Sequence, residues 1–412
     1  MIHINFERLK NNIETLSKIG AEENHAISRM AFSQADMEAR EWLKKQILEA
    51  NLELYIDGAA NIFGKTNANS QKPSILIGSH LDTVPLGGHL DGSLGVLVGL
   101  ECLQRIREEN IQTEYPLEMV SFTDEEGRFG GLFGSQSLCG EITPDFLYRA
   151  ADLNGLSLLD AMKNCGLNAF DSLHARRNPQ TIHSYLELHI EQGPVLDSLG
   201  IPSGIVEGIS GLFKWNLKIH GFPNHAGTTP MPMRKDAFMG LAEFANEIPR
   251  ILEEDGSENS VATIGRVNLI PGSANTVPGI AEFTIDVRDP NMEVLKSLEH
   301  AIRKSLSAIV RRRDLKYEFD IISEVIPANC APEIIQCIAD TSDDLGIKVH
   351  RMVSGAIHDA QIMSKITKVG MIFVPSIGGK SHSAAEWTAW EDIEIGANLA
   401  LNSLLKMAKI LH

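Results

Sequence analysis

Short apolar runs that alternate with helical segments are the feature that most constrains how this 412-residue chain can fold. Residues 75–78, 117–122 and 185–190 form such runs, and residues 96–103 between the first two have a helical pattern. Short, nearly continuous apolar runs are typical of strands that are buried on both faces of a sheet. The alternation therefore predicts an α/β domain with a central mixed sheet flanked by helices.

Residues 210–328 have a different pattern. The segment 213–219 alternates strictly, with its aromatic and aliphatic side chains on one face, and this predicts a half-buried strand. A helix, two strands, a second helix and a last strand at 316–322 complete a β-α-β-β-α-β order, which is typical of a ferredoxin-like α+β sandwich. We expect this domain to be inserted into the first, which then comprises residues 1–209 and 329–412.

Composition excludes several classes of protein. The formal net charge of -17 repels phosphate backbones, so nucleic acid is not an expected partner. No apolar run reaches the ~20 residues needed to span a bilayer, and the N-terminal segment lacks the apolar block of a signal peptide, so we expect a cytoplasmic protein with no membrane partner. The five cysteines are scattered and form no Cys-x-x-Cys pair, which argues against a disulfide framework and a zinc knuckle.

The segment GSHLDTVPLGGHLDGSLG, residues 78–95, places ionisable side chains directly after an apolar run. His80 and Asp82 share one face of an extended chain, so either both bind one ion or Asp82 supports the His80 ring from behind. Asp91 precedes a helix, whose N-terminus favours a negative charge. By itself the segment is equally consistent with a solvated turn whose acids cap helices.

A second segment, SFTDEEGRFGG at residues 121–131, changes that balance. Three adjacent carboxylates, including Glu125 and Glu126, follow a strand at the end where open α/β sheets place their ligands. Their mutual repulsion requires a compensating cation, and a divalent metal leaves one glutamate as ligand and its neighbour free to act as a base. His189 and His382 also follow predicted strands, so four strand ends together predict a metal centre.

Six motifs in this order resemble those of the M20 metallopeptidase-like amidohydrolases, and the resemblance spans nearly the whole chain. Within that family they are most similar to the N-carbamoyl-L-amino acid hydrolases, β-ureidopropionases and allantoate amidohydrolases. The motifs are GSHLDTVP (78–85), TDEEG (123–127), HIEQG (189–193), HAGTTP (225–230), DVRD (286–289) and SHSAAE (381–386).

The resemblance implies a zinc-peptidase-like catalytic domain with two divalent metal ions per subunit, usually zinc, although manganese, cobalt or nickel often supports activity. The implied ligands are His80, Asp91 as the bridge, Glu126, His189 and His382. It further implies that Asp82 orients His80 and that Glu125 is the general base for hydrolysis.

The resemblance also implies that the inserted domain is a lid and the interface of a homodimer. His225 would then reach the partner's site and stabilise the tetrahedral oxyanion. Arg288 is expected on the open face of the inserted sheet, where a guanidinium suits bidentate capture of a substrate carboxylate. Asn275, Gln192 and Gly355 are implied as further contacts of the substrate.

The segment ISGLFKW, residues 209–215, bears on the choice of substrate. Allantoate amidohydrolases tend to have glutamine and arginine after the glycine, whereas the apolar residues here resemble those of the L-carbamoylases. Lys214 shares the open face and could act as a second cation near the substrate, so allantoate stays open.

The predicted activity is metal-dependent hydrolysis of N-carbamoyl-L-amino acids to amino acid, ammonia and carbon dioxide. The alternatives are an allantoate amidohydrolase, an aminoacylase or dipeptidase of the wider family, and a non-catalytic metal-dependent binding protein. The intact Glu125 argues against the last of these.

Overall fold

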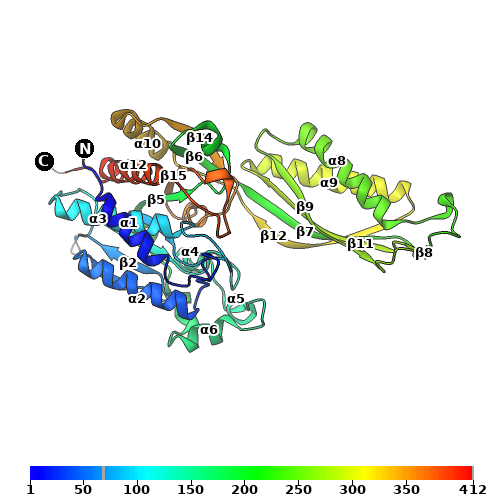
Figure 1. Ribbon diagram of the computed structural model, residues 1–412, viewed down its shortest axis with the longest axis horizontal. Coiled ribbons are helices and arrows are strands. Elements are labelled where there is room, and N and C mark those ends of the chain that lie inside the picture. Colours follow the sequence, from blue (N-terminus) through cyan, green and yellow to red (C-terminus); the bar gives the residue numbers. More distant parts are fainter. Residues whose placement is uncertain (67–69, 411–412) are drawn as a thin grey trace. The chain divides into compact units, whose positions relative to one another are not determined.

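The computed structural model describes residues 1–66 and 70–410 and divides into two compact units (Figure 1). The first unit comprises Met1–Glu207 and Asn329–His412, and the inserted unit comprises Gly208–Ala328. Each unit has its own buried apolar core.

A nine-stranded mixed sheet forms the centre of the first unit. Its order is β1-β2-β4-β3-β5-β15-β6-β13, and β14 pairs with β6. The bounds are β1 (Glu53–Ile56), β2 (Ile62–Lys65), β3 (Ser74–His80), β4 (Leu117–Phe122), β5 (Ile182–Ile190), β6 (Ser203–Ile209), β13 (Ala328–Asn329), β14 (Val349–Ser354) and β15 (Lys368–Val374). The four adjacent strands β4, β3, β5 and β15 run parallel to one another, so their carboxyl ends meet at one edge of the sheet. The predicted α/β class with a mixed sheet is confirmed.

Helices flank this sheet on both faces (Figure 1). Their bounds are α1 (Phe6–Leu16), α2 (Gln34–Glu49), α3 (Ser93–Glu108), α4 (Phe133–Cys139), α5 (Pro144–Arg149), α6 (Leu158–Asn164), α7 (Val195–Leu199), α10 (Pro332–Leu345), α11 (Asp359–Met363) and α12 (Trp390–Ala408). Ser33 caps α2 by accepting a hydrogen bond from the Asp36 N–H.

Helix α3 lies against the sheet at unusually close range. A Cβ atom at Gly95 would lie only 2.4 Å from the carbonyl oxygen of Leu188 in β5, so no larger residue fits there without movement of the main chain. This approach fixes the first turn of α3, and the loop that precedes it, beside the carboxyl ends of β3 and β5.

The inserted unit is a four-stranded antiparallel sheet of order β12-β7-β11-β9, with both long helices packed on one face (Figure 1). Its elements are β7 (Gly211–His220), β8 (Asn224–His225), α8 (Ala237–Asp255), β9 (Val261–Ile270), β10 (Thr276–Val277), β11 (Ile280–Asp289), α9 (Met292–Arg312) and β12 (Lys316–Val325). Phe213, Trp215, Leu217 and Ile219 are all buried toward the helices, as the alternation predicts. Within residues 1–66 and 70–410, no helix is long and apolar enough to cross a membrane.

Candidate metal centre and active site

The five predicted metal ligands converge at the carboxyl edge of the first unit's sheet. His80 is the last residue of β3, His189 is the penultimate residue of β5, and Glu126 follows β4 by four residues. Asp91 lies in the loop before α3, and His382 lies in the loop between β15 and α12. Because β3, β4 and β5 are parallel neighbours, the edge where they end collects side chains from segments far apart in the sequence.

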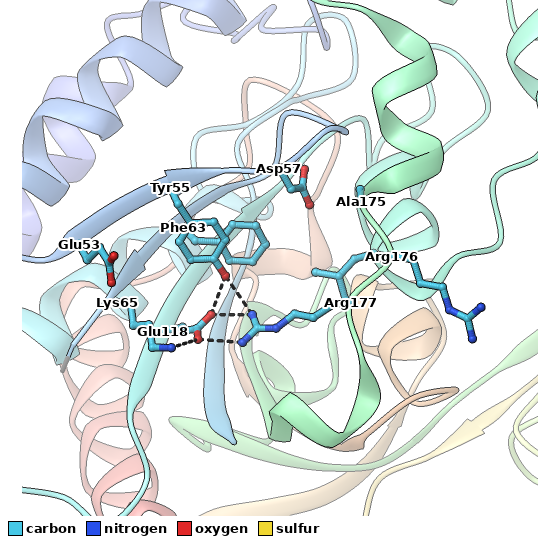
Figure 2. A pocket seen from close by; sticks show the side chains of 10 residues that line it. Glu53, Tyr55, Asp57, Phe63, Lys65, Glu118, Ala175, Arg176 and Arg177 are labelled. Carbon is cyan, nitrogen blue, oxygen red and sulfur yellow. Dashed lines mark hydrogen bonds and ion pairs between the residues drawn. The ribbon is translucent and has the colours of Figure 1, made fainter. Parts of the chain in front are cut away.

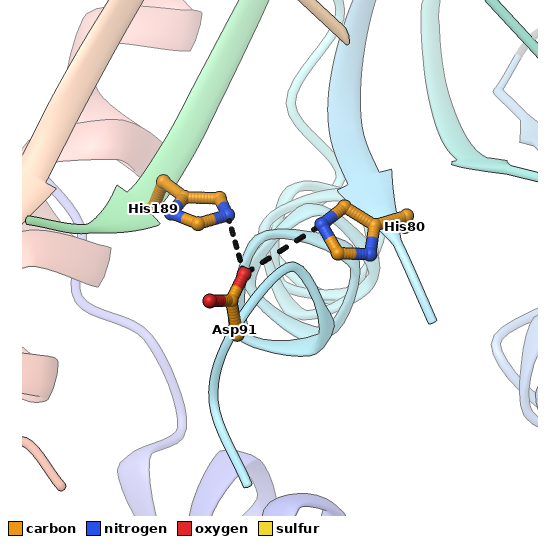
Figure 3. Close-up of side chains that lie close together, drawn as sticks. All are labelled: His80, Asp91 and His189. Atoms are coloured by element: carbon orange, nitrogen blue, oxygen red, sulfur yellow. Dashed lines mark ion pairs between the residues drawn. The ribbon is translucent and has the colours of Figure 1, made fainter. Parts of the chain in front are cut away.

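Asp91 lies at the centre of this cluster. Its Oδ1 is 3.2 Å from His189 Nε2 and 3.7 Å from His80 Nε2, and Figure 3 shows both rings directed at the carboxylate. Its Oδ2 is 3.4 Å from His382 Nε2, which in turn is 3.5 Å from Glu126 Oε2. Among the described residues, four groups of three potential ligands overlap here, and Asp91 belongs to two of them, the group with His80 and His189 and the group with Glu126 and His382.

The two buried histidines are held in the tautomer that a metal ligand requires. His80 Nδ1 lies 2.9 Å from the carbonyl oxygen of Asp82, and His189 Nδ1 lies 2.9 Å from that of Ile190. Since a carbonyl oxygen only accepts, each Nδ1 carries a proton, and each Nε2, which faces Asp91, is the nitrogen that would bind a metal.

The donor set fits divalent cations. Glu126 Oε1 is buried and has no hydrogen-bond partner among residues 1–66 and 70–410, as expected for an oxygen reserved for a metal. Imidazole nitrogens and carboxylate oxygens suit zinc, manganese, cobalt and nickel alike.

The prediction for the Asp82 side chain is corrected by the structure. The main-chain carbonyl of Asp82, and not its carboxylate, contacts the His80 ring. The carboxylate instead accepts the N–H of Glu125 at Oδ1 (3.3 Å) and the N–H of Glu126 at Oδ2 (3.1 Å). Strand β3 ends at His80, so the two-residue period that would place both side chains on one face does not extend to Asp82.

Glu125, the predicted base, lies beside the potential ligands. Its Oε2 is 3.5 Å from His80 Nε2, and its side chain is 10% exposed. Burial, followed by repulsion from Glu126, raises the pKa of the Glu125 carboxyl well above its usual value. For Asp91, burial by itself would raise the pKa, but the hydrogen bond and charge of His189 outweigh it and hold the pKa well below the usual range. Carboxylates gathered in this way mark a position for positive charge.

Gln192 contacts the Asp91 carboxylate. Its Nε2 donates to Asp91 Oδ2 at 2.6 Å, and its main-chain N–H donates to Ser376 Oγ. Its Oε1 is buried and accepts no hydrogen bond within the part of the chain that the structure describes. A buried acceptor of this kind is available to an N–H group of a ligand.

Two residues of the cluster were not assigned roles from the sequence. Glu386 is buried, and its Oε1 accepts the N–H of Asp91 (3.0 Å) while its Oε2 accepts the N–H of His382 (3.2 Å), so it joins two ligand-bearing loops. His358 packs its ring against that of His189, with 4.5 Å between the centroids. Glu386 is the last residue of the SHSAAE motif and His358 lies in the segment SGAIHD, but nothing in the sequence indicated a role for either side chain.

Gly355 lies in the bend between β14 and α11 of the first unit and is exposed. The other predicted substrate contacts lie in the inserted unit. His225 in β8 pairs with Thr276 in β10, and the Ala226 N–H donates to the Asn275 carbonyl, so the His225 and Asn275 segments are adjacent. His225 is exposed, and its Nδ1 accepts the N–H of Gly227, which leaves Nε2 as the donor of the neutral ring.

Lys214 and Arg288 meet on the open face of the inserted sheet, as predicted. Asp286 lies between them, 3.0 Å from Lys214 Nζ and 2.9 Å from Arg288 Nε. The three residues line a cavity of about 370 Å³ together with Thr263 and Thr284. Two cations and one carboxylate leave one net positive charge in this cavity.

A larger cavity, of about 420 Å³, lies beside β1 and β2 (Figure 2). Figure 2 shows the buried Glu118 carboxylate contacted by Arg177, Lys65 and Tyr55. Glu118 is the second residue of β4, whereas the potential ligands follow the last, and the strand length separates them by roughly 15 Å. We interpret this ionic network as structural.

A mixed α/β sheet whose parallel strands end in two groups of potential metal ligands is the arrangement of a metallohydrolase. The model of peptidase family M20/M25/M40 matches residues 76–406, and the chain belongs to this family. It is 36% identical to the N-carbamoyl-L-amino acid amidohydrolase of Geobacillus stearothermophilus over 407 residues, and this match covers 98% of each chain. It is 32% identical over 406 residues to the allantoate amidohydrolase of Escherichia coli, again with 98% of each chain covered. A crystal structure of an amidase of the hydantoinase/carbamoylase family from Burkholderia multivorans superposes with a TM-score of 0.91 at 31% identity, covering 99% of this chain and 98% of that one.

Proposed function

We propose that this protein is a metal-dependent amidohydrolase that cleaves the ureido C–N bond of N-carbamoyl-L-amino acids. The observation that carries the proposal is the position of Asp91, which is shared by two groups of potential ligands, next to Glu125. The full-length similarity to an N-carbamoyl-L-amino acid amidohydrolase supports the ureido class of substrate.

Two divalent ions, with zinc as the expected metal, would occupy the two groups. His80, Asp91 and His189 would hold one ion, and Asp91, Glu126 and His382 would hold the other. When bound, such ions polarise a carbonyl oxygen and acidify water.

The chain's own residues then handle the protons and the substrate. Glu125 takes a proton from the attacking water and transfers it to the departing nitrogen, which leaves as ammonia. The remaining N-carboxy amino acid decays to carbon dioxide and the free amino acid. The Gln192 Oε1, which has no hydrogen-bond partner among the described residues, accepts an N–H of the ureido group, while the Asp82 carboxylate fixes the main chain of Glu125.

The inserted unit, together with Gly355 of the first unit, would supply the remaining contacts. We assign the substrate carboxylate to Arg288, with Lys214 adding positive charge, and further hydrogen bonds to Asn275 and to the main chain of Gly355. In this proposal the inserted unit acts as a lid and joins two subunits, and the His225 Nε2–H of one subunit stabilises the oxyanion in the other. The exposure of His225 and the orientation of its ring are consistent with that role.

Allantoate is the second candidate substrate, because Lys214 offers a cation on the same face as Arg288. The deciding experiment measures ammonia release from N-carbamoyl-L-amino acids, their D-isomers and allantoate by protein loaded with zinc or manganese. We expect preference for the L-carbamoyl compounds and loss of activity with a chelator. Activity on allantoate alone would assign the second function, and activity on neither would withdraw the ureido class.

A further inference from the structure

A cavity of about 290 Å³ in the first unit adjoins the candidate metal centre. Glu126 forms part of its wall, and the Glu126 carboxylate lies 3.5 Å from His382 Nε2. Pockets for whole ligands usually measure about 300 to 1,000 Å³, so this cavity is suited to one part of a small substrate. We call it the Glu126 pocket.

The rest of the wall is mainly apolar. Most of its exposed surface is apolar, and Met30, Val84, Pro85 and Leu153 are its apolar side chains. Apart from Glu126, the two charged residues of the wall are paired with each other, because Arg128 donates to the Asp152 carboxylate and also to a main-chain carbonyl oxygen. An apolar group therefore enters this pocket without leaving a charge unpaired.

Leu153 lines this pocket, but it is itself exposed to water. Its side chain is fully exposed, although the turn that carries it is fixed by hydrogen bonds from the Asn154 and Leu156 N–H groups to Asp152 Oδ1. An ordered turn that presents a leucine to water gains free energy when an apolar group covers that leucine.

We propose that the Glu126 pocket receives the substrate side chain and selects N-carbamoyl-L-amino acids with a large apolar side chain, such as leucine. This inference rests on the proposed function. The α-carbon of such a substrate lies two bonds from the ureido carbon, so its side chain must lie next to the residues that surround the metal centre. Glu126 belongs to both sites and provides that proximity. Allantoate has no apolar side chain to fill the pocket.

The test compares kcat/KM for N-carbamoyl-L-leucine and N-carbamoylglycine. Because a single buried methylene can change selectivity by about tenfold, we expect the native protein to prefer the leucine compound, which has a larger apolar side chain, by at least on the order of 100-fold. Leu153→Ala should lower kcat/KM for the leucine compound by roughly tenfold and leave the glycine compound unchanged. Leu48→Ala removes another exposed leucine, on α2, and should leave both values unchanged.

A binding measurement separates recognition from turnover. In the Glu125→Gln protein, calorimetry should show tighter binding of the leucine compound than of the glycine compound, and Leu153→Ala should reduce that difference. Equal use of both compounds, or an equal effect of Leu153→Ala on both, would overturn the pocket and leave the proposed function standing. A changed sedimentation coefficient for Leu153→Ala would assign the residue to a subunit contact instead. Absence of ammonia from every carbamoyl compound would end the proposed function and this inference together.

Discussion

Replacing Asp82 by asparagine tests the role that the structure gives to its carboxylate. The two oxygens accept the N–H groups of Glu125 and Glu126, and the side chain is buried. Asparagine keeps one acceptor, so one N–H would face an amide NH₂ group. A hydrogen bond to a charged group contributes about 1.5 to 3 kcal/mol, and a buried donor without a partner costs about 1 to 3 kcal/mol. We expect the free energy of unfolding to fall by about 2 to 3 kcal/mol.

The same substitution should affect catalysis through Glu125. A displacement of about 1 Å in a catalytic group costs on the order of 100-fold in rate, so we expect kcat for an N-carbamoyl-L-amino acid to fall about 100-fold. Metal bound at His80 should be retained, because His80 Nδ1 contacts a main-chain carbonyl that asparagine preserves. Urea unfolding, ammonia release and metal analysis measure the three effects.

Asp57→Asn provides the matched control. The Asp57 carboxylate also accepts two main-chain N–H groups, from Ala59 and Asn61, but it lies beside β1, away from the candidate metal centre. The Asp57→Asn protein should be less stable than the native protein and should keep its kcat. If Asp82→Asn lost metal while each metal-loaded molecule kept its kcat, the carboxylate would orient His80 after all, and our assignment would be refuted.

Three further predictions follow from individual contacts. Burial by itself would raise the pKa of Glu118, but its hydrogen bonds with Arg177 outweigh this and lower the pKa to about 2 from 4.5. The resulting stability of about 3 kcal/mol is present above pH 4.5 and is lost as the pH falls toward 2. Glu118→Gln should remove that part of the pH dependence of the free energy of unfolding, measured in urea. Gly95→Ala should destabilise the protein by about 1 to 3 kcal/mol, because the added Cβ would meet a carbonyl oxygen of β5. Gly265→Ala should change stability little, because among the described residues the nearest atom to its added Cβ lies 3.9 Å away. Equal effects of the two substitutions would contradict the close approach of α3. Glu125→Gln should retain metal by elemental analysis and lose about 10² to 10⁴ in kcat, and normal turnover would remove it as the base.

The parts of the fold that follow from local patterns could be predicted from the sequence. Strict alternation at residues 213–219 indicated which face of β7 is buried, and short apolar runs indicated the parallel strands. The carboxyl ends of such strands share one edge, so the convergence of His80 and His189 could also be expected.

Contacts that depend on strand ends and distant loops could not be predicted. The function of the Asp82 carboxylate depends on where β3 stops, which the sequence pattern leaves open by a residue or two. Glu386 contacts the Asp91 loop although the two residues are 295 positions apart in the sequence. Local hydrophobic periodicity does not indicate contacts between such distant segments. Asp286 lies opposite Lys214 only because of the register of β11 on β7.

The most direct test of the account is the number of metal ions bound per chain, measured by elemental mass spectrometry on protein loaded with zinc. The account predicts two ions in the native protein, one in His382→Ala, where the His80, Asp91 and His189 group is intact, and loss of both sites in Asp91→Ala. A single ion in the native protein, or two in His382→Ala, would contradict a centre in which Asp91 joins two metal sites.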